Sequence, residues 1–416
     1  MSKLTDLFSR GKPSKAAGDG PGGQSMVKDS SPGGTQPAAE KPSRFKVPAK
    51  LSAALNFLPH LKDIFAGKKQ LVGLDVGSGS LKLAEILETK TGYLLNHFSE
   101  ISLDKGTIED GILVNPEALT EKVKILFKGT GLQGKALVVS LSGHAAIAKK
   151  VAFPTMEAPE LRDMIHDEAS KYLPFDNMDD VSYDFQILGQ NEYNPNQMDV
   201  MLVAAKKDVI ADYIEAIENA GLMVMIMDVD TFCLETVYEA NYDFGPADIV
   251  AMVNIGASIT NINVVKGSMS IFTRDFTLAG NTITEAVQSA YKLTFEAAEA
   301  MKIDGPDTDD TARDAFRNSL LSYADPICTE IERSIDYFRS TSGGDNIKKI
   351  LLSGGVAAIP GITGDLTQRL GIETEILNPF RKIDCNKKVL NPERIDEIRP
   401  NAAVAVGLAL RKVGDK

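Results

Sequence analysis

The chain has 416 residues, of which 43% are hydrophobic, enough to bury the cores of two or three domains. Its formal net charge of −12 argues against general binding to nucleic acids, which depends on clustered Lys and Arg side chains. Three widely spaced cysteines and four histidines, without a CxxC or HExxH motif, argue against a disulfide framework and against a metal site made of protein ligands alone.

The N-terminal tail, residues 1–68, differs in composition from the rest of the chain. Residues 10–48 are rich in Gly, Pro, Ser, Lys and Ala, and such a segment cannot bury enough apolar surface to offset its ordering, which predicts disorder. Residues 51–66 carry apolar side chains at helical spacing between lysines, although Pro59 interrupts the pattern. This segment is either an amphipathic helix for a membrane surface or a partner, or a short packed helix or linker. Without a signal region or a spanning apolar run, the chain is expected to be cytoplasmic.

Strands and helices alternate in the first half of the folded part, which is typical of a layered α/β architecture. Strands are predicted over 71–75, 81–87, 93–102 and 136–141, and a helix over 115–129. Residues 144–222 then indicate a small α+β insertion. Its predicted elements are a strand over 146–153, a helix over 158–172, strands over 181–188 and 198–205, and a helix over 207–220.

The second half repeats the opening pattern of the first. Residues 223–229 lead into a helix predicted over 231–240, and a second strand–turn–strand unit at 249–265 matches the first at 71–87. The sheet continues to Gly280. Further on, the sequence predicts mostly helical segments over 281–303 and 308–342, a buried strand over 347–352 and a closing helix over 400–413.

Three glycine turns separate apolar segments: the first at residues 77–80, the second at 256–259 and the third at 353–359. Because Gly has no Cβ, backbone amides at such turns can approach a phosphate or a base. Asp75 precedes the first turn and suits Mg²⁺ held through water, and Lys82 follows it and would neutralise phosphate charge. No GxxxxGK[ST] motif occurs, which excludes a Walker A loop. The sequence therefore predicts one nucleotide held between two related halves.

These turns and the motifs around them resemble the actin-like ATPase superfamily. The details are most similar to the PilM family of type IV pilus assembly proteins, which is related to FtsA. The matching motifs are GLDVGSGSLKLAE, NIGASITNINVVKG, LAGNTIT, AAEAMKI, LSGGVAAIPGI and NPF, and the resemblance runs from about Lys69 to about Arg411. It implies an α/β actin-like (ribonuclease H-like) fold with two lobes and an FtsA/PilM-type 1C insertion subdomain.

The resemblance also implies a division of the chain into subdomains. After the tail at 1–68, these are the first part of 1A (69–143), 1C (144–222), a return to 1A with an interdomain segment (223–248), 2A (249–280 and 346–385), 2B (281–345) and a closing segment on 1A (386–416).

The resemblance implies ATP and Mg²⁺ as cofactors and assigns residues to them. The residues expected near the phosphates are Gly77, Ser78, Gly79, Ser80, Lys82, Gly256, Ala257, Ser258 and Gly280. Gly354 and Gly355 are expected under the adenine, with apolar contact from Val356 and Ile359. Lys302 and Arg333 are implied as ribose or adenine neighbours, and they fit equally well as solvated charges on helices. Asp75 and Asn254 are the expected residues for Mg²⁺, through water.

Asn254 departs from the family pattern, which places Asp at this position. Asn brings no charge and is no base, so Mg²⁺ affinity and hydrolysis should both suffer while ATP binding survives through backbone amides. Phosphoryl transfer also needs a residue that orients water, and Asp230 and Glu235 are the candidates by family position. Asp230 fits equally well as the cap of a helix that begins at Thr231.

The resemblance implies an ATP-binding scaffold with slow or absent hydrolysis, recruited to the cytoplasmic face of the inner membrane. In the family, the N-terminal tail of PilN docks in a groove between 1A and 1C, which suits a short linear segment. Further expected partners are the PilN/PilO/PilP alignment complex and the pilus motor ATPases, with a role in twitching motility.

Two alternatives stay open at this stage. An FtsA-like division protein would carry a C-terminal membrane-targeting helix, whereas this chain ends in LALRKVGDK, and residues 51–66 would have to substitute for it. A small-molecule kinase of the same superfamily would need a substrate pocket signature, and Asn254 weakens its phosphate chemistry.

Overall fold

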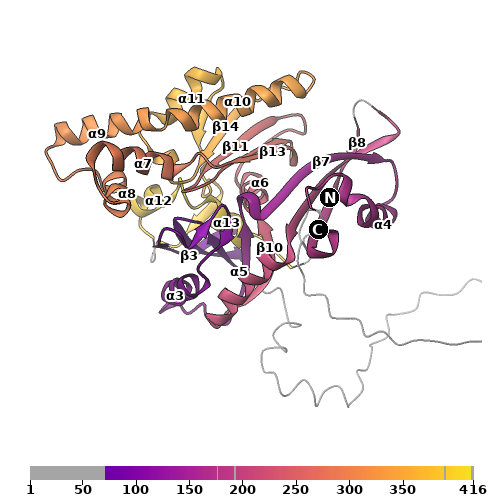
Figure 1. The fold of residues 1–416 in the computed structure, drawn as a ribbon, viewed down its shortest axis with the longest axis horizontal. Helices are drawn as coiled ribbons and strands as arrows, with labels where there is room; N and C mark the ends of the chain where they lie inside the picture. The colour runs from indigo at the N-terminus through magenta and orange to yellow at the C-terminus, as the bar shows by residue number, and fades with distance from the viewer. Residues whose placement is uncertain (1–70, 176, 192–193, 388–389, 414–416) are drawn as a thin grey trace, which may run out of the picture. The chain divides into compact units, whose positions relative to one another are not determined.

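Two mixed sheets with the same strand pattern organise the protein (Figure 1). In this computed structural model the described residues are 71–413, apart from 176, 192–193 and 388–389. In each sheet, the first three strands along the chain pair with one another in antiparallel fashion. On the other side of the first of these strands, the sheet continues with parallel strands. The predicted α/β architecture and the predicted repeat of the strand–turn–strand unit are both confirmed.

The first sheet has the strand order β10-β6-β1-β2-β3-β16. Its strands are β1 (Val72–Val76), β2 (Ser80–Thr89), β3 (Gly92–Ser102), β6 (Ala136–Leu141), β10 (Met223–Val229) and β16 (Ile383–Cys385). Helices cover both faces, which explains why β1 and β6 are buried along their whole length and are apolar except at Asp75 and Ser140. On one face lie α3 (Pro116–Phe127) and α5 (Lys207–Asn219), and on the other α6 (Asp230–Asn241) and α13 (Ala403–Ala409).

The second sheet has the order β13-β12-β11-β14-β15. Its strands are β11 (Ile249–Ile255), β12 (Thr260–Lys266), β13 (Met269–Phe276), β14 (Lys349–Ser353) and β15 (Thr374–Ile376). One face packs against five helices: α7 (Gly280–Tyr291), α8 (Phe295–Asp304), α9 (Asp310–Tyr323), α10 (Asp325–Thr341) and α11 (Ile362–Leu370). The other face shares a core with the first sheet.

Helices α6 and α13 form the centre of that shared core. Apolar side chains of both sheets belong to the same buried cluster as these two helices. The two helices approach so closely that a Cβ on Gly407 would lie 2.2 Å from the Cys233 carbonyl oxygen. Likewise, a Cβ on Gly73 of β1 would lie 2.4 Å from the Ala405 carbonyl oxygen. Both glycines are therefore required by close backbone packing rather than by a turn.

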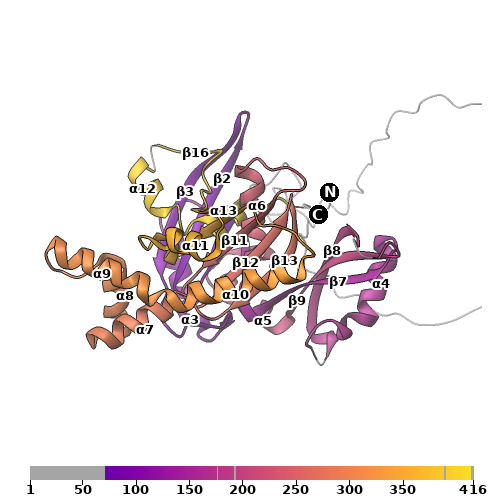
Figure 2. The same ribbon diagram turned by 90° about the horizontal axis from the view of Figure 1, so that it is seen from above.

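A third sheet, of order β7-β9-β8, extends away from the other two and touches the second sheet at β13 (Figures 1 and 2). Its strands are β7 (Ala146–Pro154), β8 (Val181–Gln190) and β9 (Gln197–Lys206). Helix α4 (Ala158–Glu168) covers one face with a core of its own, and the other face packs with α5 onto the first sheet. The predicted α+β insertion is thus a separate layer, joined to the first sheet through α5.

Most predicted elements are confirmed within a few residues, and the chain end is the main correction. The closing helix predicted over 400–413 is only α13, and a separate helix, α12 (Pro392–Ile398), precedes it. Pro400 and Asn401 lie in the turn between the two helices, where Pro400 cannot supply the amide hydrogen of a continuous helix. The helix predicted over 158–172 ends at Glu168 and continues as a 3₁₀ turn.

Several short elements had no sequence-based prediction. They are α11, α12, β15, β16 and the hairpin of β4 (Ile108–Glu109) and β5 (Ile112–Leu113). The predicted tail of residues 1–68, with its helix at 51–66, lies outside the described residues. Among the helices of residues 71–413, none has the length and hydropathy needed to cross a membrane. The predicted subdomain boundaries stay predictions.

The close contact of α6 and α13 gives a stability prediction. Gly407→Ala should destabilise the protein by about 1–3 kcal/mol, because its Cβ meets backbone atoms that can only move with the helix. The matched control is Gly364→Ala on α11, where a Cβ meets nothing within 4 Å, and it should be neutral or stabilising by up to about 1 kcal/mol. Urea midpoints measure both variants, and equal midpoints for the two would contradict the packing.

Candidate functional site

The first and second glycine turns are built in the same way. In the first, the Gly77 amide donates to the Ser80 carbonyl oxygen at 3.2 Å, and in the second the Gly256 amide donates to that of Ile259 at 3.0 Å. Each turn joins two antiparallel strands in the same register. The structural equivalence shows that the second half repeats the first down to single hydrogen bonds.

Equivalent polar rows cross the two sheets beside these turns. In the first sheet, β1, β2 and β3 bring Asp75, Lys82 and Glu100 side by side. In the second sheet, β11, β12 and β13 bring Asn254, Asn261 and Asp275 into the same places. The predicted metal residues Asp75 and Asn254 thus occupy equivalent positions, one in each half.

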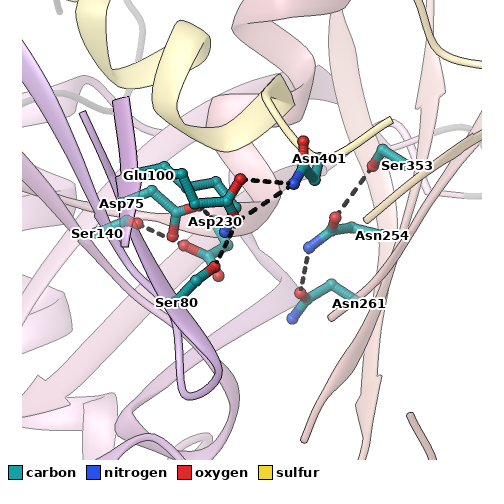
Figure 3. Close-up of polar contacts among 10 residues, drawn as sticks. Asp75, Ser80, Glu100, Ser140, Asp230, Asn254, Asn261, Ser353 and Asn401 are labelled. Carbon is teal, nitrogen blue, oxygen red and sulfur yellow. Dashed lines mark hydrogen bonds and ion pairs between the residues drawn. The ribbon is translucent and has the colours of Figure 1, made fainter. Parts of the chain in front are cut away.

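The two rows differ in their chemistry. In the first row, Lys82 Nζ lies 3.2 Å from Asp75 Oδ2, with both side chains about nine-tenths buried. In the second row, Asn254 Nδ2 donates to Asn261 Oδ1 at 3.4 Å, and Ser353 Oγ donates to Asn254 Oδ1 at 3.1 Å (Figure 3). Asn261 Nδ2 in turn donates to Asp275 at 2.9 Å. An ion pair therefore occupies one half and an amide pair the other.

The turns themselves meet between the sheets. The Ser78 and Ser258 hydroxyls are hydrogen-bonded to each other, and a Cβ on Gly79 would lie 2.7 Å from Ala257 Cβ. The amide of Gly280, at the start of α7, donates to the Gly256 carbonyl oxygen at 2.9 Å. The structure thus brings the predicted phosphate residues of both halves together.

The third glycine turn closes this group. Gly354 has a φ of +91°, and a Cβ there would lie 2.1 Å from the Ile255 carbonyl oxygen, so only Gly fits. A Cβ on Gly355 would meet nothing within 4 Å, so open space lies beside this residue. Val356 and Ile359 are buried in the core of the second sheet. Of the predicted third-turn residues, Gly355 is the one that borders free space.

Lys302 and Arg333 are placed differently. Lys302 Nζ donates to the Gly280 carbonyl oxygen at 3.2 Å and pairs with Glu299 at 2.6 Å, so it lies beside the second turn. The Arg333 side chain is 71% exposed and pairs with Glu330 at 3.3 Å. Within the described residues, Arg333 makes no hydrogen bond or ion pair to another predicted site residue.

Asp230 belongs to the site, but its predicted capping role is wrong. Helix α6 begins at Asp230 itself, with Val229 at the N-cap, and the Asp230 carboxylate accepts a hydrogen bond from Ser140 Oγ on β6. The N-cap position falls on Val229, the last residue of β10, and its apolar side chain cannot accept a hydrogen bond. Glu235 is also buried, further along α6.

Burial and charge shift the ionisation of this cluster. Burial, and then the neighbouring Asp75, raise the pKa of Asp230 well above its ordinary value. Burial also raises the pKa of Asp75, although Lys82 opposes this. Burial lowers the pKa of Lys82, but the surrounding carboxylates, Asp75 first, raise it above its ordinary value. The site therefore keeps a buried ammonium beside an Asp230 that favours its protonated form.

The residues present fit an adenine nucleotide with Mg²⁺. Lys82 supplies a positive charge at the converging turns, and Gly355 is exposed, with nothing within 4 Å of where its Cβ would lie. Among the described residues, no group of three or more His, Cys, Asp or Glu side chains could hold a metal ion. Mg²⁺ would thus depend on phosphate oxygens together with Asp75 and Asn254 through water, and would neutralise phosphate charge.

Five residues described at the site had no sequence-based prediction: Glu100, Ser140, Asn261, Asp275 and Asn401. Asn261 had a usable signal, because it follows Asn254 by the same seven residues that separate Lys82 from Asp75. Glu100 and Asp275 require the register of the third strand in each sheet. Asn401 had no signal, since its neighbours in space come from distant segments.

The raised pKa of Asp230 gives a test of its burial. Because the folded-state pKa is raised, the wild type should lose stability as the pH rises from the ordinary carboxyl range toward that pKa. Asp230→Asn cannot ionise, so its urea midpoint should rise relative to that of the wild type between about pH 4 and pH 7. Asp307→Asn, at an exposed turn before α9, should follow the wild type. An Asp230→Asn midpoint that falls relative to that of the wild type as the pH rises would contradict a desolvated Asp230.

Comparison with known proteins agrees with this geometry. The family model described as "Type IV pilus assembly protein PilM" matches residues 73–413. A chain in the solved PilM-PilN type IV pilus biogenesis complex is 27% identical, covers 83% of this chain and 99% of that chain, and has a TM-score of 0.72. This likeness confirms the actin-like fold expected from the sequence.

More distant relatives were also found. The cell division protein FtsA of Enterococcus hirae is 22% identical in an alignment of 351 residues that covers 74% of this chain and 78% of that protein. The ethanolamine utilization protein EutJ of Carboxydothermus hydrogenoformans is 14% identical and covers 87% of this chain and 98% of that chain, with a TM-score of 0.45, too low to support an inference. The match across the folded part shows that the chain belongs to the PilM family of type IV pilus assembly proteins.

Proposed function

We propose that this protein is an ATP-binding scaffold of type IV pilus assembly. It would dock the N-terminal tail of a PilN-like membrane protein and so be recruited to the cytoplasmic face of the inner membrane. The single observation that carries ATP binding is the meeting of three glycine turns beside the buried Lys82. Docking is supported by the family and by the likeness to a chain of a PilM-PilN complex.

Slow or absent hydrolysis is part of the proposal. The second row holds the neutral Asn254–Asn261 pair where the first holds a carboxylate and an ammonium. Asp230, the candidate for orienting water, is buried and accepts a hydrogen bond from Ser140, which holds its carboxylate against β6. The site would therefore bind ATP as a structural ligand more readily than turn it over.

The space beside Gly355 gives a direct test of ATP binding. Wild-type protein should release or absorb heat on titration with ATP–Mg²⁺, and Gly355→Val should weaken this binding by at least about tenfold, because the side chain fills space meant for the nucleotide. The control is Gly364→Val on α11, whose Cβ also meets nothing within 4 Å. Absence of heat with the wild type would overturn ATP binding, and wild-type affinity in Gly355→Val would overturn its placement over the third turn.

A groove between α3 and α5 is the candidate for tail docking. It has a volume of about 530 Å³ and lies between the predicted 1A and 1C subdomains. Thr120 Oγ1 donates to the Ala216 carbonyl oxygen at 2.8 Å and so joins the two helices. Four carboxylates and one ammonium line the groove, from Glu117, Glu121, Asp212, Glu215 and Lys124. A short segment with basic side chains is the complementary partner.

Charge reversal in this groove tests the docking proposal. Glu121→Lys with Glu215→Lys should weaken binding of a labelled PilN tail peptide by about tenfold, because two attractive contacts become repulsive. Glu160→Lys, exposed on α4, makes the same charge change outside the groove and should bind as the wild type does. Fluorescence anisotropy at two salt concentrations measures the effect, and equal affinity in all three proteins would exclude this groove.

Nucleotide state is proposed to tune the groove by population shift. The second sheet contacts the insertion directly, since Thr273 Oγ1 donates to the Ala148 carbonyl oxygen at 3.0 Å. Tyr213 on α5 donates from its hydroxyl to the Gly111 carbonyl oxygen at 3.0 Å beneath the groove. If ATP favours one arrangement of the sheets, the tail should bind ATP-loaded and empty protein with different affinities, and identical affinities would remove the coupling.

A further inference from the structure

Glu100 on β3 accepts hydrogen bonds from two residues that are far apart in the sequence. Ser80 Oγ, at the end of the first glycine turn, donates to Glu100 Oε1 at 2.8 Å. Asn401 Nδ2 donates to Glu100 Oε2 at 3.0 Å and to Oε1 at 3.3 Å (Figure 3). One carboxylate thus joins the first turn to the segment between α12 and α13.

The same segment is joined to the second sheet. The amide of Gly354, in the third turn, donates to the carbonyl oxygen of Pro400 at 2.7 Å. Pro400 and Asn401 are neighbours in the chain, so the residue bonded to Gly354 and the residue bonded to Glu100 are joined by a single peptide bond. A continuous path runs from Ser80 through Glu100 and Asn401 to Gly354, from the first glycine turn to the third.

The orientation of the Asn401 amide follows from chemistry. Its nitrogen faces the Glu100 carboxylate, because an oxygen there would repel it. Its oxygen is buried, and in the part of the chain that the structure describes it has no hydrogen-bond partner. A buried acceptor without a partner is unfavourable, so the Asn401 oxygen does not account for an amide at this position. The hydrogen bonds from the Asn401 nitrogen to Glu100 are the favourable contacts of this side chain.

We propose that Glu100 and Asn401 are positioning residues that clamp the first glycine turn to the third, and so hold both sides of the nucleotide site in register. They act through Ser80 and Gly354 and need not touch the nucleotide. This inference rests on the proposed ATP binding. It also revises the role expected for Ser80: its hydroxyl hydrogen is used by Glu100, so Ser80 fixes the turn instead of donating to a phosphate.

An isosteric exchange tests the clamp. Asn401→Asp places a second carboxylate against Glu100 and should weaken ATP binding by about tenfold or more, as measured by calorimetry. Glu100→Gln alone should weaken binding less than Asn401→Asp does, because its one oxygen still accepts from Asn401 although the second carboxylate oxygen is lost. The double variant should recover most of the affinity, since Gln at position 100 can donate to Asp at position 401. Asn115→Asp, at the N-cap of α3, is the matched control and should bind as the wild type.

A second measurement does not depend on ATP. Without nucleotide, Asn401→Asp should speed amide hydrogen exchange in the third turn, where Gly354 donates to Pro400, and the double variant should restore protection. Unchanged exchange and affinity in Asn401→Asp, or a double variant no better than the single one, would overturn the clamp. Absence of ATP binding by the wild type would overturn the proposed function instead, and the exchange data would still decide the clamp.

Discussion

The buried pair of Lys82 and Asp75 is the interaction around which the rest of the site is arranged. Removing two charges from water is costly, and such a pair is weak evidence for stability. The neighbours of the pair explain why it is retained. Glu100 lies opposite Lys82 on the next strand, and the Asp230 carboxyl also interacts with Lys82. One ammonium among three carboxyl groups leaves this row with an excess of acidic groups, so a phosphate ligand would need Mg²⁺ with it to offset their charge.

The two halves have the same fold but differ in the charge of the polar side chains beside their glycine turns. Strand order, turn geometry and register are the same in both sheets, yet the equivalent of the Asp75–Lys82 ion pair is the neutral Asn254–Asn261 pair. Ser353 donates to Asn254 in the second half, and Asn261 donates to the Asp275 carboxylate, so this row has a carboxylate but no ammonium. The positive charge of the two rows therefore lies in the first half alone, at Lys82.

The sequence predicted what depends on local pattern. Apolar runs, glycine turns and the repeated strand–turn–strand unit indicated both sheets and the turns that meet between them. It was wrong at Asp230, because the helix begins one residue earlier than expected and its N-cap position falls on Val229, which is not visible from residue type. It could not indicate the contact of Glu100 with Asn401, which are 301 residues apart and meet only after both sheets have formed.

The shared core explains how such distant segments can be held together with the accuracy that a binding site needs. Asp230 is the first residue of α6, and Asn401 lies just before α13. These two helices touch backbone to backbone at Gly407 and Cys233, with no side chain between them to take up movement. A shift of either helix must therefore move the other. The Asp230 carboxyl near Lys82 and the Asn401 amide that donates to Glu100 are therefore both attached to one rigid pair of helices, and this pair positions both halves of the site.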